Sequence, residues 1–330
     1  LWQFYVTFMI VALGSGLGGW LAIISMVNNW FIRKRSLAIA TAMSGIHFGG
    51  FLVPVLALGI ETQGFRTTTL GIGIFLLAII VPVSRLIRNR PEEYGLRPDG
   101  SPTPPEEGQS QPSEAALQDD EEPEFTAVQA LKTPVFWILS IAQVTSSVSI
   151  TTLSLHLSPR LVDMGMSLTA AGVIVLIYTA IALPSQFASG YAGTRLPKPI
   201  LIAFFYLLQA IAMTLIAVAT TVPVVILFAV LFGIGFGGRV PLTTAIRADY
   251  FGRKAFATIM GLSQFVSNLA MMGAPLFAGY WFVSRGSYFV PFISFAGLSL
   301  AGAVLMLFVR KPKAVGAATA DRSSAPTGSA

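Results

Sequence analysis

Long apolar stretches constrain this chain more than any other feature of its sequence. There are nine of them, at residues 2–27, 36–60, 67–88, 133–157, 170–193, 199–219, 223–247, 255–282 and 288–309. A helix of about 20 apolar residues crosses the hydrocarbon core of a bilayer. Hydrophobic residues make up 54% of the chain and charged residues 11%, whereas soluble domains carry about 25% charged residues. The sequence therefore predicts an all-α integral membrane protein.

The one long polar stretch, residues 89–132, divides the chain into two parts. Eleven of the fifteen acidic residues fall within 92–124, among many Pro and Ser residues. Because such a composition cannot bury a hydrophobic core, we predict a disordered linker. It would join an incomplete N-terminal bundle of three helices (1–88) to a C-terminal bundle of six helices (133–310), which a tail at 311–330 follows.

The basic residues predict how the chain is oriented in the membrane. If the linker is cytoplasmic, seventeen Lys and Arg residues lie on its side, and three, Arg66, Arg160 and Arg285, lie on the other. Cytoplasmic loops carry the excess of Lys and Arg. We therefore expect a multi-pass protein of the inner (plasma) membrane with the linker and C-terminus in the cytoplasm. The same clustering argues against nucleic acid as a partner.

An internal repeat relates the two parts of the chain. GSGLGGW at 14–20 matches GIGFGGR at 233–239, WFIRK at 30–34 matches YFGRK at 250–254, and Pro54 matches Pro275. The offsets are 219, 220 and 221 residues, so the last three apolar stretches pair with the first three. Transporters are often built from such repeats, and completing the symmetry here requires about three more helices before Leu1. We expect nine of twelve helices, in two pseudo-symmetric bundles, from an N-terminally truncated chain.

Four further segments carry a family resemblance. They are WFIRKRSLAIATAMSG (30–45), RPEEYGLRPDG (90–100), FWIL (136–139) followed by HLSPRLVDMGMS (156–167), and ADYFGRKAFATIMGL (248–262). In this order they resemble the major facilitator superfamily, and within it the bacterial relatives of monocarboxylate and oxalate–formate transporters. The resemblance implies secondary transport by alternating access, of a small organic anion such as a monocarboxylate. It implies no enzymatic activity.

The same family has a charged loop of the form G-x-x-x-D-R-x-G-R/K in each half. Residues 190–198, GYAGTRLPK, match it at Gly190, Arg195 and Lys198, which we take as a gating loop. Thr194 replaces the acid and Pro197 replaces the second glycine. This departure leaves open whether the loop forms a gating ion pair.

Arg239 is the most conspicuous polar residue inside an apolar stretch. An Arg near the membrane centre costs about 3 kcal/mol, so it normally faces a cavity or a partner. We predict that it binds the substrate anion in the cavity between the bundles, facing His47 across that cavity. The alternative is an Arg that reaches the headgroups or bonds a backbone carbonyl.

The other candidate substrate-binding residues are one histidine and four side-chain amides. His47 could bond the substrate, carry a coupled proton, or bond a neighbouring helix. Gln264 and Asn268 are four residues apart and share a helix face, where they either line the cavity or join helices. Gln143 and Gln186 are the remaining candidates. No Asp or Glu lies within the nine stretches, so a coupling carboxylate is not visible and substrate exchange stays open.

Transport of an organic anion is one of several interpretations of this sequence. The Phe- and Met-rich stretches are also typical of an exporter of hydrophobic compounds, and a non-transporting membrane sensor could use the same scaffold. A membrane enzyme lacks any catalytic constellation in this sequence. The G-x-G-x-x-G patterns at 14–19 and 233–238 lie inside apolar stretches, where they indicate close helix packing rather than dinucleotide binding. We expect no cofactor or metal, and a monomer in the bilayer with a small-molecule substrate.

Overall fold

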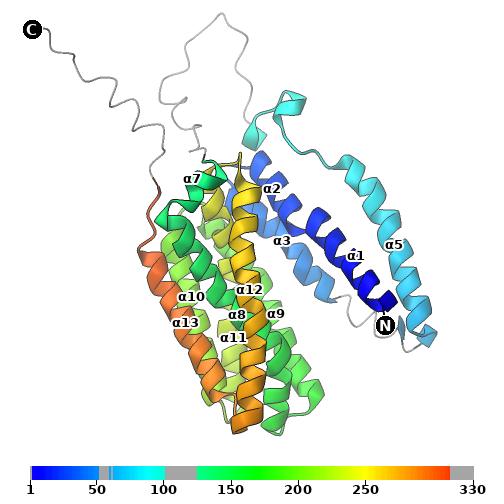
Figure 1. Cartoon of the computed structure of the whole chain (residues 1–330), viewed down its shortest axis with the longest axis vertical. Helices are drawn as coiled ribbons and strands as arrows, with labels where there is room; N and C mark the ends of the chain where they lie inside the picture. The colour runs from blue at the N-terminus through cyan, green and yellow to red at the C-terminus, as the bar shows by residue number, and fades with distance from the viewer. Residues whose placement is uncertain (1, 52–58, 61, 101–124, 313–330) are drawn as a thin grey trace, which may run out of the picture.

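The computed structural model describes residues 2–51, 59–60, 62–100 and 125–312, and within these ranges it contains helices and no strand (Figure 1). The long helices are α1 (Trp2–Gly18), α2 (Trp20–Trp30), α3 (Arg35–Phe51), α5 (Phe65–Leu86), α8 (Pro134–Asp163), α9 (Leu168–Ala192), α10 (Lys198–Val218), α11 (Val222–Phe251), α12 (Phe256–Arg285) and α13 (Phe289–Leu307). Three short helices, η1 (Glu92–Tyr94), η2 (Pro98–Gly100) and α7 (Ala127–Leu131), lie between α5 and α8.

Eight described stretches are long and apolar enough to cross a membrane, with α1 and α2 counted together. They coincide with eight of the nine predicted stretches. The ninth, 36–60, is described as α3 only as far as Phe51, and residues 52–58 lie outside the described residues. The predicted all-α membrane architecture is confirmed, whereas the count of nine helices stays a prediction.

Helices α8 to α13 form one bundle, and the N-terminal helices lie along one side of it (Figure 1). Within the bundle, α11 packs against α9 and α10, and α8 packs against α12 and α13. Helix α3 contacts α9 and α11, and α2 contacts α12. Helices α1 and α5 extend away from the bundle, and α5 has no buried residue. The helices of the two parts therefore meet mainly at the α3–α9–α11 contact and the α2–α12 contact.

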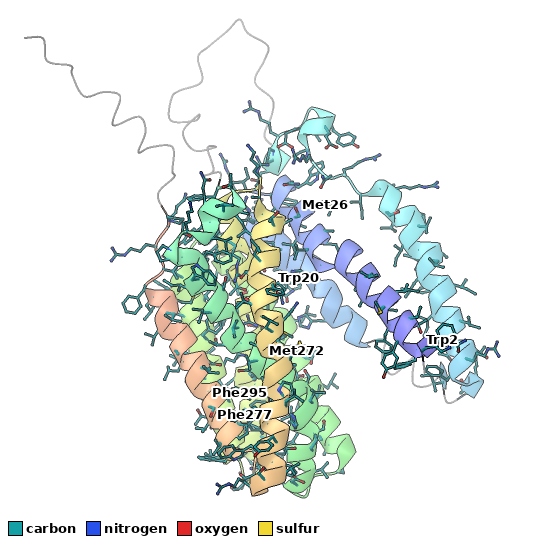
Figure 2. All side chains as sticks on the ribbon, in the orientation of Figure 1. Trp2, Trp20, Met26, Met272, Phe277 and Phe295 are labelled. Carbon is teal, nitrogen blue, oxygen red and sulfur yellow. The ribbon has the colours of Figure 1, made fainter. Side chains whose placement is uncertain are left out.

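A shared apolar core holds the second of these contacts together. Ile24 and Val27 of α2 and Met43 of α3 are buried against Phe256 and Met260 of α12. Trp20 and Met26 pack at the edge of the same cluster, and Figure 2 shows both on α2 near α12, far from Trp2 at the other end of α1. Where such a contact would otherwise face water, burial of its apolar surface stabilises it. Where it would otherwise face lipid, close packing of the side chains stabilises it.

Capping residues explain why the C-terminal bundle begins where it does. Thr126 and Gln129 form a reciprocal capping box at the start of α7. The Thr133 hydroxyl accepts from the Phe136 N–H, one residue before Pro134 opens α8. A side-chain oxygen at this position satisfies a backbone N–H that the first helical turn leaves without a partner, and Pro suits the first helical residue.

The predicted linker is structured at both ends. Its first part contains η1 and η2, its last part contains α7, and Phe125 is buried edge-on against Phe251 of α11 at 5.7 Å between ring centroids. The described flanks, 89–100 and 125–132, thus contain short helices, because apolar and capping residues find partners there, and the disordered linker stays a prediction for the segment between them. Residues 101–124 lie outside the described residues.

The repeated glycines pack closely in the second copy. A Cβ on Gly237 would collide with the Ala182 backbone of α9, and one on Gly238 would collide with the Phe205 ring of α10. The prediction of close helix packing is confirmed for α11, which runs without a break through Pro241. In the first copy, a Cβ added to Gly14, Gly16 or Gly18 would meet no described heavy atom within 4 Å. A break at Gly19 divides α1 from α2.

Candidate functional site

A polar contact sits where α3 crosses α9. The Gln186 side chain of α9 donates from Nε2 to the Ala40 carbonyl of α3 at 2.6 Å, and its Oε1 lies 3.2 Å from Nε2 of His47. His47 is 7% exposed and Gln186 is 2% exposed. The structure thus brings together two of the predicted site residues, one from each part of the chain. If His47 donates in this contact, the neutral ring keeps its proton on Nε2.

Gly190 lets α3 and α9 approach closely at this crossing. A Cβ on Gly190 would lie 2.7 Å from the Ala40 Cβ and 3.1 Å from the Ser36 carbonyl oxygen. Real Cβ atoms do not come so close to other carbon atoms, so the crossing depends on a residue without a side chain. Close packing of α3 against α9 therefore explains why a glycine occupies position 190 of the predicted gating loop.

An ion cluster follows at the end of the same crossing, on the side of the bundle that carries α7. Asp249, near the end of α11, binds Arg35 at the start of α3 through Oδ1 at 2.7 Å and Lys198 at the start of α10 through Oδ2 at 2.6 Å. Arg35 is 1% exposed, whereas the Asp249 side chain is 26% exposed. One carboxylate therefore joins a cation of the N-terminal helices to a cation of the C-terminal bundle.

Lys198 is thus the residue of the predicted gating loop that forms an ion pair. The family pattern places an acid at position 194, whereas the acid that pairs with Lys198 in this structure is Asp249 of α11. Arg195 instead stacks over the Tyr191 ring, 4.4 Å from its centroid, within the same loop. Arg35 and Asp249 were not among the predicted site residues. The only sequence signal for them is their position in the repeated segments around WFIRK and YFGRK.

The loop after α5 reinforces this end of the molecule. The Asp99 carboxylate accepts from the backbone N–H groups of Ile32 and Arg33 at 2.9 and 2.7 Å. Arg253 donates to the Asn29 carbonyl at 3.1 Å and pairs with Glu92 at 3.3 Å. A polar cavity of about 590 Å³ lies there, lined by Asn29, Arg90, Glu92, Glu93, Arg253 and Lys254. Polar and ionic contacts therefore join the two parts at this end, beside the apolar cluster of α2, α3, α11 and α12.

The remaining neutral candidates lie on α8 and α12. Gln264 donates to Asn268 at 3.1 Å on the exposed face of α12, which confirms that the two share a face. Gln143 of α8 donates to Ser147 at 3.4 Å and is half-buried. Helices α8 and α12 pack side by side, so these polar groups lie on neighbouring helices.

Arg239 lies elsewhere than predicted. Its guanidinium carbon is 5.6 Å from the ring centroid of Tyr206 on α10 and 5.7 Å from that of Phe236, and the residue is 3% exposed. His47 meets Gln186 instead. The structure does not bring Arg239 and His47 together, because Arg239 leaves α11 on the face that packs against α10.

These helices define a multi-pass membrane protein, and comparison with known proteins gives its family. The family model of the Major Facilitator Superfamily matches residues 1–181 and again residues 139–328. The chain therefore belongs to the Major Facilitator Superfamily, and the predicted resemblance and fold are confirmed.

Several curated proteins are similar to this chain over most of its length. Monocarboxylate transporter 12-B of Danio rerio is 26% identical over 299 residues, which cover 86% of this chain and 62% of that protein. MFS-type transporter pynF of Aspergillus niger is 27% identical over 291 residues, covering 87% and 62%. Agnestins efflux protein AgnL12 of Paecilomyces divaricatus is 21% identical over 309 residues, covering 92% and 64%. The chain thus spans a little under two thirds of the length of these relatives.

Proposed function

We propose that this chain works in secondary transport of a small organic anion, such as a monocarboxylate, across the cell's inner (plasma) membrane by alternating access. The observation that carries the proposal is the crossing of α3 and α9, with the Arg35–Asp249–Lys198 cluster at its end. The ion pairs of this contact can be broken and remade as the two parts move, and the apolar cluster that lies beside them is small. Relatives named as monocarboxylate transporters support the substrate class.

In the proposed topology the ion cluster is the cytoplasmic gate. Seventeen Lys and Arg residues on the linker side against three on the other favour a cytoplasmic linker and C-terminus. Opening to the cytoplasm would separate α3 from α9 and α11. It would break the Arg35–Asp249 pair while Lys198 and Asp249 stay together in the C-terminal bundle.

The proposed substrate contacts come from both parts of the chain. His47 and Gln186 lie at the crossing, and Gln143, Gln264 and Asn268 lie on α8 and α12. Amide groups can donate to a carboxylate, and an imidazole can hold a proton near neutral pH. We assign the coupled proton to His47. Arg239 is not among these contacts, because it is enclosed within the C-terminal bundle.

Export of a hydrophobic compound is the second candidate. It is favoured by the similarity to a relative named as an efflux protein. The two candidate functions differ in whether the polar side chains are needed to bind the substrate. A neutral apolar solute would need neither His47 nor the amide groups.

Transport by the full-length protein in reconstituted vesicles tests the proposal. We expect saturable uptake of a radiolabelled monocarboxylate, competed by other short monocarboxylates and reduced at least tenfold by the double variant Gln264→Leu/Asn268→Leu. The matched control is Ser284→Leu on the same helix, which should leave uptake intact. Vesicles that fail to accumulate monocarboxylates but expel a lipophilic dye would establish the exporter instead.

A further inference from the structure

The last turn of α2 buries a side-chain amide that has no hydrogen-bond partner. Asn28 is 0% exposed, and neither its Nδ2 nor its Oδ1 makes a hydrogen bond to any residue that the structure describes. Both atoms are also closed off from solvent. Burying an amide is unfavourable when its hydrogen bonds to water are lost and not replaced. The amide of Asn28 therefore makes this packed state less stable than an apolar side chain of similar size would.

Asn28 lies on the face of α2 that meets the C-terminal bundle. Ile24, one turn before Asn28, belongs to the same apolar cluster as Phe256 of α12. The Leu21 side chain, two turns before Asn28, would lie 4.0 Å from a Cβ added to Gly261 of α12. Residues four and seven positions apart share one face of a helix. The amide is thus placed in the contact between the two parts of the chain, at α12.

The internal repeat shows that an apolar side chain suits this position. The offset of 220 residues pairs Asn28 with Ala248 of α11, since 248 − 28 = 220. Ala248 is also 0% exposed and belongs to the same apolar cluster. Helix α11 packs against α3 in the second copy, as α2 packs against α12 in the first. Packing alone therefore does not explain why the first copy has an amide at this position.

We propose that Asn28 weakens the closed contact between α2 and α12 and so makes it easier for the cytoplasmic gate to open. This inference rests on the proposed alternating access. When the two parts separate at this end, water reaches the amide and supplies the hydrogen bonds that it lacks in the closed state. The Arg35–Asp249 pair and the apolar cluster favour the closed state, and Asn28 opposes them. A small free-energy difference between the two states lets a transporter populate both.

The rate at which a single buried cysteine is alkylated measures the balance between these states. The chain contains no cysteine, and Ser36, which is 1% exposed, lies where α3 crosses α9. In the full-length protein, a membrane-impermeant maleimide added on the cytoplasmic side should label Ser36→Cys in proportion to the open fraction. Asn28→Leu has a side chain of similar size, and it should slow labelling at least about fivefold, because it removes the cost of the unpartnered amide. Asn28→Asp buries a charge in the closed state and should speed labelling.

Two further variants separate the effect of the amide from that of packing. Asn28→Ala introduces the residue of the matching position in the second copy and cannot overpack the contact, so slower labelling in this variant also supports the inference. Gln3→Leu, which replaces an exposed amide on α1, is the matched control and should leave the labelling rate unchanged.

The outcomes distinguish the inference from the gate on which it rests. Labelling of Asn28→Leu and Asn28→Ala at the parent rate or faster would overturn the role of Asn28 and leave the gate in place. If Asp249→Asn is labelled no faster than the parent protein, the gate itself is refuted, and the inference about Asn28 falls with it.

Discussion

At the residue scale, Asp249 is the side chain on which most of the ionic contact depends. Its two carboxylate oxygens pair separately with Arg35 and Lys198. Because Arg35 is 1% exposed, loss of the carboxylate would leave a buried cation without this counter-charge. An exposed ion pair contributes up to about 1 kcal/mol to stability, and removing one partner of a buried pair costs about 3–5 kcal/mol. The Arg35–Asp249 pair, with one buried and one partly exposed partner, lies between these two cases.

Asp249→Asn should therefore lower the free energy of unfolding by about 1–3 kcal/mol and shift the transporter toward the cytoplasm-open state. Thermal unfolding in detergent measures the first effect, and accessibility of a cysteine introduced at Ser36→Cys to a cytoplasmic thiol reagent measures the second. Asp163→Asn, at the exposed end of α8, is the matched control. Equal behaviour of the two variants would remove Asp249 from the gate.

His47 gives the second prediction at this scale. His47→Gln keeps a side chain that can hydrogen-bond Gln186 but cannot carry a proton near neutral pH. We expect an imposed pH gradient to stop stimulating monocarboxylate uptake in this variant, while exchange of labelled for unlabelled substrate continues. Unchanged stimulation by the gradient would show that another group, or none, carries the coupled proton.

At the scale of the elements, the glycine-rich segment of α11 sets how closely α9 and α10 can pack. Gly237 faces the Ala182 backbone, which cannot move aside as a flexible side chain could. Gly297 on the outer helix α13 is exposed, and a Cβ added there would meet no described heavy atom within 4 Å. A methyl group added at position 237 would therefore collide with a neighbouring helix, whereas one added at position 297 would point into open space.

Gly237→Ala should destabilise the protein by about 1–3 kcal/mol through overpacking. Gly297→Ala should be neutral, or should stabilise by about 0.5–1 kcal/mol, because Ala is the better helix former. Comparing the unfolding temperatures of the two variants checks both expectations. Similar stability of the two variants would mean that α9 can move away from α11 at little cost.

The same elements show what the sequence could predict. Runs of apolar residues predicted the long helices to within a few residues at most ends, because bilayer thickness fixes their length. Capping by Thr126 and Thr133, by contrast, gave structure to flanks that composition alone described as linker. The Asp249 cluster could not be predicted either, since its members at 35, 198 and 249 meet only after three helices have packed. The surroundings of the Arg239 side chain could not be predicted for the same reason, since they depend on which helix packs against its face of α11. In the structure that helix is α10.

At the scale of the whole molecule, the two parts of the chain meet through one crossing, one apolar cluster and one set of ionic contacts. Helices α1 and α5 extend away from the bundle (Figure 1), while the contact of α3 with α9 is close. This arrangement suits a rocking motion of one part against the other that opens and closes the α3–α9 crossing.

The segment that connects the two parts gives a further prediction at this scale. A short deletion within residues 106–112 should leave uptake unchanged, because a polar stretch rich in Pro and acidic residues acts as a spacer. Transport in reconstituted vesicles measures this. Loss of uptake on so short a deletion would mean that the segment does more than connect the two parts.

The central claim is that the parts separate at the ion cluster during transport, and a distance measurement across that gate tests it most directly. The chain contains no cysteine, so Lys34→Cys and Thr194→Cys, both exposed, can carry spin labels on the two sides of the crossing. Double electron–electron resonance on the reconstituted full-length protein measures the distance between the two labels. Without substrate we expect mostly a short distance. Substrate should add a population of molecules with a longer distance, and Asp249→Asn should make that population larger. A single distance that neither substrate nor Asp249→Asn changes would contradict this mechanism.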